Sequence, residues 1–252
     1  PVITAGTVNQ YTDKLVINYT VSNKQADGVT EGSPIPSANY ICQYGTSENY
    51  SDSVTSTSSA CTISGLDQTK TYYYKVTITD TAGNSSYITG NSGTATIQTA
   101  SISNATPAGW AQSKSTTLTY DGTGIETPSY YFYVQQSSGN DAVGTASSNV
   151  MSCGTSTAPD SCSGSTSDLN ANTWYKLSGS TASESITVTL TNENGGAILV
   201  RTADAKGNTA GTSSSAISSI DRTAPVITLG TAQKYTDKLV INYTVSNKQA
   251  DG

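Results

Sequence analysis

The chain has 252 residues and a formal net charge of −6, and only 12% of its residues are charged. Its 12 Lys and Arg residues form no basic run, which argues against a nucleic-acid partner, and no apolar stretch reaches the ~20 residues that a membrane-spanning helix needs. The low charge also differs from the highly charged composition that is typical of disordered chains.

Short stretches of alternating apolar and polar residues recur through the first hundred residues, and they predict β-strands rather than helices. In the stretch 14–21, the apolar side chains Leu15, Ile17 and Tyr19 fall on one face. Similar strands are predicted at 39–45, 60–66, 71–80 and 93–99. We therefore expect an all-β fold, with a first antiparallel β-sandwich over residues 1–100.

A second series of strands follows and predicts a second sandwich over residues 101–222. Its strands are expected at 115–121, 129–136, 173–179, 184–192 and 196–208. The stretch 129–136 leaves two inner faces open, either Tyr131 with Tyr133 or the set Tyr130, Phe132 and Val134. The polar, Gly- and Ser-rich stretch 137–172 between them predicts a long irregular inserted loop of functional interest.

The end of the sequence repeats its beginning. Residues 225–252 match residues 1–28 at 24 of 28 positions, with differences only at Ala5/Leu229, Val8/Ala232, Asn9/Gln233 and Gln10/Lys234. Residues 223–252 are therefore interpreted as the first strands of a third sandwich. Two strands alone are marginally stable in water, so they need either the remainder of that sandwich or a groove in another chain, which they would complete as a donor segment.

The four cysteines fall into two local pairs, one in each half of the chain. Cys42 and Cys61 form one pair, and Cys153 and Cys162 form the other. The absence of histidine and of a Cys-x-x-Cys motif argues against zinc. We therefore predict two disulfides and an oxidising compartment, each bond contributing about 2–3 kcal/mol, with four free thiols as the alternative.

Three motifs resemble those of fibronectin type III domains and of bacterial Ig-like repeats in large cell-surface adhesin or stalk proteins. They are Leu66 followed six residues later by Tyr72, the turns DTAGN (80–84) and DAKGN (204–208), and IDRTAPVIT (220–228). The resemblance implies tandem antiparallel sandwiches and a corner tyrosine, Tyr72, whose hydroxyl bonds to nearby backbone. It also implies calcium at domain junctions, for which the candidate ligands are Asp80, Asp204 and Asp221. The alternative is that these carboxylates cap their own turns.

No catalytic pattern is visible. The chain has no histidine to act as a general base and no Gly-x-Ser-x-Gly elbow, so we expect no enzyme activity and no cofactor apart from calcium. Aromatic side chains offer a different kind of site, a surface on which a sugar ring stacks. The candidates are Tyr73, Tyr131, Tyr133, Trp110 and Trp174, with packing within the sandwiches as the alternative.

These observations lead to a functional expectation. The chain is interpreted as a structural repeat segment of an extracellular bacterial surface stalk, adhesin or filament, whose partners are neighbouring copies of the repeat or other subunits. Two alternatives remain open. One is an adhesive module that binds a glycan or a host protein through the 137–172 stretch, and the other is an accessory domain of a secreted carbohydrate-active enzyme.

Overall fold

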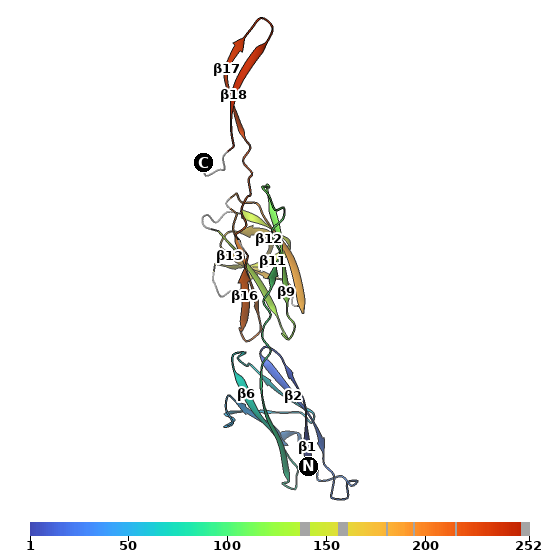
Figure 1. Ribbon diagram of the computed structural model, residues 1–252. Helices are drawn as coiled ribbons and strands as arrows, with labels where there is room; N and C mark the ends of the chain where they lie inside the picture. Colours follow the sequence, from blue (N-terminus) through green and yellow to red (C-terminus); the bar gives the residue numbers. More distant parts are fainter. Residues whose placement is uncertain (137–141, 156–160, 180, 194, 215, 248–252) are drawn as a thin grey trace.

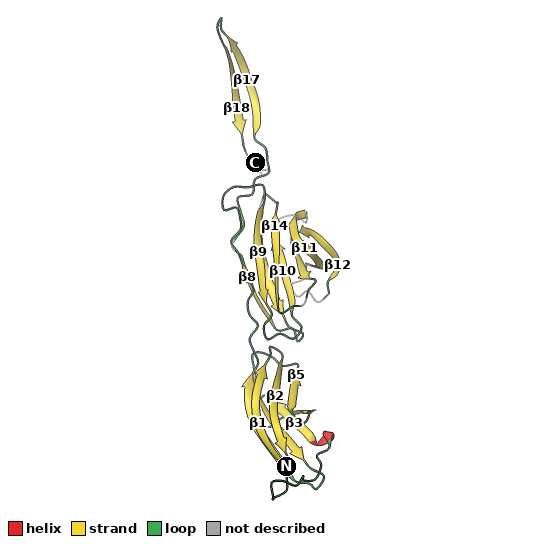
Figure 2. Cartoon of the chain, turned by 90° about the vertical axis from the view of Figure 1, so that its right-hand side faces the viewer, coloured by secondary structure: helices red, strands yellow, loops and turns green. Residues whose placement is uncertain are grey.

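The computed structural model describes the chain except for residues 137–141, 156–160, 180, 194, 215 and 248–252. Two bodies of strands and a two-stranded hairpin follow one another along the long axis of the molecule (Figure 1). The regular secondary structure of the described part is antiparallel strand, apart from one helix, the short 3₁₀ segment Ser37–Asn39 (Figure 2). The predicted all-β, antiparallel sandwich fold is confirmed.

The first sandwich consists of two antiparallel sheets. One has the strand order β1-β2-β5 and the other β4-β3-β6-β7. The strands are β1 (Val2–Gln10), β2 (Lys14–Ser22), β3 (Tyr40–Gly45), β4 (Asp52–Thr55), β5 (Ala60–Ser64), β6 (Thr71–Thr79) and β7 (Ser85–Gly93). The two sheets pack together through the apolar faces of their strands. In β6, the buried residues alternate with more exposed ones, and the buried set is Tyr72, Tyr74, Val76 and Ile78.

A tyrosine fixes the corner that leads into β6. The backbone N–H of Asp67 donates a hydrogen bond of 2.9 Å to the hydroxyl of Tyr72, and Leu66 beside it is buried in the first core. This is the contact expected of the Leu66 and Tyr72 pair. The second sandwich has a similar bond of 2.6 Å, from the backbone N–H of Asn170 to the hydroxyl of Tyr175, which no sequence motif predicts.

The second sandwich has its own hydrophobic core and a continuous strand order. That order is β16-β15-β10-β13-β11-β14-β9-β8, with β12 paired to β11. The strands are β8 (Ser101–Ile102), β9 (Lys114–Asp121), β10 (Ser129–Gln135), β11 (Ala142–Gly154), β12 (Ser163–Asn170), β13 (Thr173–Leu177), β14 (Ser183–Leu190), β15 (Ala197–Ala203) and β16 (Thr209–Ser213). Strand β11 pairs with β13 through one part and with β14 through another, so it joins the two sides.

The structure shows which face of β10 points into the core. Tyr130, Phe132 and Val134 are fully buried in the second core. The hydroxyl of Tyr130 donates to the carbonyl oxygen of Thr181 at 2.7 Å, and burial raises the pKa of Tyr130 to about 12. Because side chains alternate along a strand, Tyr131 and Tyr133 lie on the outer face.

The expectation of an irregular loop over 137–172 is wrong for most of that range. Residues 142–154 and 163–170 form the paired strands β11 and β12, while 137–141 and 156–160 lie outside the described residues. The two strands are mostly polar, and only a few apolar residues in them occupy core positions, so their sequence shows no clear alternation. Val143, Val150 and Leu169 are fully buried, and they anchor the two strands to the second core.

The chain ends in an antiparallel hairpin of β17 (Val226–Lys234) and β18 (Leu239–Ser246), which we call the terminal hairpin. Its register reproduces that of β1 and β2, including a bulge at the corresponding place. The turn is also the same, because the bond from Tyr235 N–H to the Lys238 carbonyl measures 2.9 Å, as does that from Tyr11 to Lys14. Within the described residues, no helix has the length and apolar composition to cross a bilayer.

Candidate functional site: the junction, the terminal hairpin and the outer aromatic face

The two sandwiches meet at a junction built from the turn between β1 and β2. The backbone N–H of Thr12 donates to the carbonyl oxygen of Gly124 in the second sandwich at 3.0 Å. From the other side, the side-chain amide of Asn208 donates to the carbonyl oxygens of Leu66 at 3.3 Å and Thr12 at 3.5 Å. The connection is thus a set of direct contacts between folded ends rather than a bare linker.

Charged groups also gather at this junction. Lys14 forms an ion pair of 2.7 Å with Glu126 across it. Asp13 has a buried carboxylate oxygen without a hydrogen-bond partner in the structure. Burial raises the pKa of Asp13, and the negative charges of Asp204 and Glu126 raise it further. The ionised form of Asp13 is therefore disfavoured in the folded protein.

Replacing Asp13 with asparagine is expected to stabilise the protein at neutral pH. A carboxyl group whose pKa rises on folding binds its proton more tightly when folded, so its contribution to stability falls as the pH rises from the ordinary value of 3.8 through the folded pKa. Asp13→Asn should therefore raise the unfolding free energy at pH 7 by about 0.5 kcal/mol, a small gain because solvent screens the site.

Thermal unfolding of the parent and of Asp13→Asn at a series of pH values tests this. The difference should disappear below the ordinary carboxyl pKa, where Asp13 is neutral in both the folded and the unfolded state. A variant that is less stable than the parent at pH 7 would contradict the expectation and would show that the ionised carboxylate is held favourably at the junction.

The three aspartates expected to bind calcium lie in different places. The carboxylate of Asp80 accepts bonds from Ala82 N–H at 3.0 Å and Asn84 N–H at 2.8 Å, and its other oxygen accepts from the Asn84 amide at 3.0 Å. The amide of Asn84, with these backbone groups, lowers the pKa of Asp80. This carboxylate therefore caps its own turn, where Gly83 has a φ of 87°.

Asp204 and Asp221 also bond to their own turns. Asp204 accepts bonds from the backbone N–H groups of Lys206 at 3.0 Å and Asn208 at 2.9 Å, and Asp221 accepts one from Thr223 at 3.0 Å. In the described part of the chain, no group of three or more His, Cys, Asp or Glu side chains could hold a metal ion. The structure therefore does not bring Asp80, Asp204 and Asp221 together as a calcium site.

Of these three aspartates, only Asp204 lies beside the junction. Its negative charge raises the pKa of Asp13 there. Asp13 and Glu126 are not among the site residues predicted from the sequence. A signal for the first was present, because Tyr-Thr-Asp-Lys at the turn of β1 and β2 is repeated unchanged at the turn of the terminal hairpin. Nothing in the sequence around Glu126 distinguishes it from the other acidic residues.

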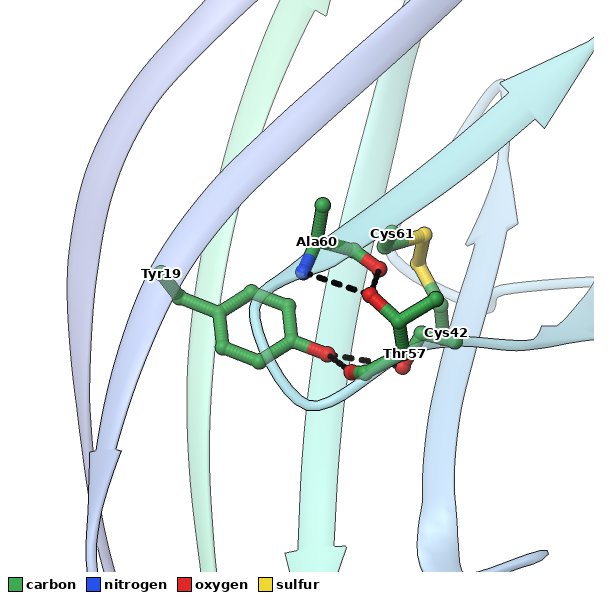
Figure 3. The surroundings of a disulfide bond; sticks show 6 residues. Tyr19, Cys42, Thr57, Ala60 and Cys61 are labelled. Atoms are coloured by element: carbon green, nitrogen blue, oxygen red, sulfur yellow. Dashed lines mark hydrogen bonds between the residues drawn. A yellow bond between two sulfur atoms is a disulfide. The ribbon is translucent and has the colours of Figure 1, made fainter. Parts of the chain in front are cut away.

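The Cys42–Cys61 disulfide joins the two sheets of the first sandwich. Cys42 is in β3 and Cys61 is in β5, and both are fully buried (Figure 3). Next to it, the hydroxyl of Tyr19 in β2 is hydrogen-bonded to the carbonyl oxygen of Thr57. Thr57 in turn accepts a bond of 3.0 Å from the backbone N–H of Ala60, so this end of the core is held by covalent and polar contacts together.

The second disulfide, Cys153–Cys162, links the end of β11 to the residue just before β12. The bridged residues are nine positions apart in sequence. Both cysteines are only partly buried, in contrast to the first pair. Both predicted pairs are thus bonded in the structure, and no cysteine of the chain is free.

The terminal hairpin exposes the residues that its counterpart buries. Leu15 is 0% exposed and Ile17 is 1% exposed, whereas Leu239 is 55% and Ile241 is 53% exposed. The same contrast holds for Tyr19 with Tyr243 and for Ile3 with Ile227. In the first sandwich, β2 pairs with β5, and the buried side of the β1–β2 pair belongs to the same core as β3 and β6. Contiguous exposed apolar surface of this kind is typical of interaction sites.

The aromatic residues considered for ligand binding divide into three groups. Trp174 is only 4% exposed, so a sugar ring cannot stack on it directly. Trp110 is 68% exposed and lies in the segment before β9. Tyr73, Tyr131 and Tyr133 are partly exposed. On the second sandwich, Tyr131 and Tyr133 lie next to each other on the same face of β10.

Comparisons with known proteins find solved structures that are similar to the chain, but they do not assign it to a family. No family model matches the chain, and no curated protein matches it. Among solved structures, chitinase ChiA74 from Bacillus thuringiensis is similar at 18% identity and a TM-score of 0.27, over 75% of this chain and 26% of that one, so the chain spans about a quarter of the chitinase.

Two other solved structures are similar over most of their own length. A carbohydrate-binding module of the β-sandwich superfamily has 15% identity and a TM-score of 0.26, over 79% of this chain and 95% of that one. The serine-rich repeat protein Srr2 from Streptococcus agalactiae has 9% identity and a TM-score of 0.26, over 85% and 91%. Similarities this low carry no argument, and the class of the protein, an antiparallel β-sandwich protein, follows from its own strands.

Proposed function

We propose that the chain is a structural repeat segment of an extracellular stalk, adhesin or filament, in which β-sandwiches related to fibronectin type III and bacterial Ig-like domains follow one another. The observation that carries this proposal is the terminal hairpin. It repeats residues 1–28 at 24 of 28 positions, yet it exposes the side chains that the first sandwich buries. Its partner is a segment equivalent to residues 29–100, which covers the same side chains in the first sandwich.

The junction supports a role in spanning distance. Direct backbone and side-chain bonds between the two ends limit bending, and Pro225 fixes the backbone just before the terminal hairpin. The two disulfides support an extracellular location, because such bonds persist in oxidising compartments. In this proposal the segment is non-catalytic, and its neighbours are further copies of the repeat.

A fusion tests the proposal directly. A copy of residues 29–100 is attached after Gly252 of the full chain, so that the terminal hairpin is followed by the strands that cover β1 and β2 in the first sandwich. The added segment is expected to fold with the hairpin into a third sandwich. Calorimetry should show an unfolding enthalpy larger by that of about 100 residues, roughly 60–80 kcal/mol.

The matched control is the same fusion with Ile241→Asp, which places a charge where the third core would form. The control should lose the added enthalpy, and its attached segment should be cleaved rapidly by proteases while the first two sandwiches persist. If the attached segment is equally protease-sensitive in both fusions, the hairpin does not begin a sandwich and the proposal fails.

A further inference from the structure

The second sandwich has an outer face that carries aromatic and cationic side chains in two rows. Tyr133 lies between Trp174 and Leu199 in the strand register, and Tyr131 lies between Lys176 and Arg201. All six side chains point away from the core because their neighbours Phe132, Tyr175 and Val200 point into it. We call this surface the outer face, and it consists of Tyr131, Tyr133, Trp174, Lys176, Leu199 and Arg201.

Aromatic rings hold the two cations of this face in place. The guanidinium of Arg201 lies 4.8 Å from the centre of the Trp174 ring, and the ammonium of Lys176 lies 5.7 Å from that of Tyr131. Tyr133 packs against Trp174 with ring centres 5.2 Å apart. These contacts fix the positions of the cations without neutralising them.

In the part of the chain that the structure describes, neither of these cations is paired with a carboxylate. Among the described residues, the ion pairs of the chain involve Lys14, Lys24 and Lys70, and neither Lys176 nor Arg201 takes part in one. Strands β10, β13, β15 and β16 contain no Asp or Glu, although the chain has 18 acidic residues. The two cations therefore lie within a run of four adjacent strands that carries no acidic residue.

We propose that the outer face binds a polysaccharide that carries carboxylate groups, such as a polyuronate. Lys176 and Arg201 flank Tyr131, so carboxylates on a linear sugar chain meet a cation on either side of this ring. The partly exposed rings of Tyr131 and Tyr133 offer apolar area to the C–H faces of sugars between them. The net charge of −6 opposes double-stranded DNA, which carries about one charge per 1.7 Å of its length, more strongly than a polyuronate, which carries one carboxylate per sugar.

Binding of the full chain to polygalacturonate, compared with neutral dextran, tests the proposal by affinity electrophoresis and titration calorimetry. We expect retardation by polygalacturonate alone, weakened by added salt because the contacts are electrostatic. The double variant Lys176→Gln/Arg201→Gln should lower the affinity at least tenfold. Thermal unfolding of this variant confirms that the second sandwich remains folded.

The chain offers a matched control on its first sandwich. Lys75 lies over the ring of Tyr87, 4.7 Å from its centre, in the sheet β4-β3-β6-β7, whose strands carry no other Lys or Arg. Lys75→Gln should leave polygalacturonate binding unchanged. Equal affinity of the parent and the double variant, equal retardation by dextran, or no binding at all would overturn the proposal. Equally tight binding of single-stranded DNA with the same dependence on Lys176 and Arg201 would also overturn it, because the face would then be a general anion site.

Discussion

Leu15→Ala is expected to destabilise the first sandwich by about 3 kcal/mol, whereas Leu239→Ala should change stability by less than about 0.5 kcal/mol. The two leucines occupy the same position in two nearly identical hairpins. Leu15 is fully buried against the first core, so its truncation leaves a cavity, while Leu239 is 55% exposed and leaves none. Differential scanning calorimetry of the two variants and the parent measures the difference.

The pair of variants also tests whether the terminal hairpin is covered in solution. If Leu239→Ala costs as much as Leu15→Ala, the hairpin is packed against something, and in a pure sample that partner is a second copy of the chain. Repeating the measurement over a range of protein concentrations distinguishes the cases, because stability that depends on association rises with concentration. A concentration-independent cost at Leu239 would contradict the exposed hairpin of the structure.

Much of the fold could be predicted because the alternation of apolar residues is strong in most strands. Leu15, Ile17 and Tyr19 alternate so regularly that their common buried face follows from the sequence alone. Strand β10 was ambiguous because aromatic residues occupy both of its faces. Only the packing of the second core decides that Phe132, and not Tyr131, points inward.

The β11–β12 pair was missed for a related reason. Serine and glycine dominate its sequence, and the buried Val143 and Val150 are too far apart to show a period of two. Bulges in the register between the two strands break the alternation further. The strands are specified by a few anchors and by the Cys153–Cys162 bond, which sequence periodicity does not register.

The junction could be predicted only in part, since it is made by residues distant in sequence. The two Asp-x-x-Gly-Asn turns were recognised, and each carboxylate caps its turn. That Asn208 reaches the backbone of Leu66 and Thr12 depends on how the two ends meet. The first sandwich has the same turn at Asp80, so the motif itself does not reveal which copy makes a contact.

Removing the Cys42–Cys61 bond is expected to cost more stability than removing Cys153–Cys162. The first bond joins cysteines 19 positions apart and the second joins cysteines 9 positions apart. The loss of chain entropy in the unfolded state alone gives a stabilisation of about 3 kcal/mol for the first bond and somewhat less for the second. Cys42 and Cys61 are also fully buried between the two sheets, so replacing both with alanine leaves a cavity as well. We expect about 4 kcal/mol for the first double variant and about 2 kcal/mol for the second.

The same bonds should also limit how far the chain extends under load, which matters for the stalk proposed above. When a sandwich unfolds under force, the disulfide carries the force past the residues between the two bridged cysteines, so these residues do not extend. Reduction of Cys42–Cys61 should therefore lengthen the unfolded first sandwich by about 60 Å, and reduction of Cys153–Cys162 should lengthen the second by about 25–30 Å, at ~3.4 Å per residue. Single-molecule pulling with and without reductant measures both increments, and the alanine variants serve as controls that no longer respond to reductant. Unfolding lengths that do not change on reduction would show that the bonds do not carry load in the extended chain.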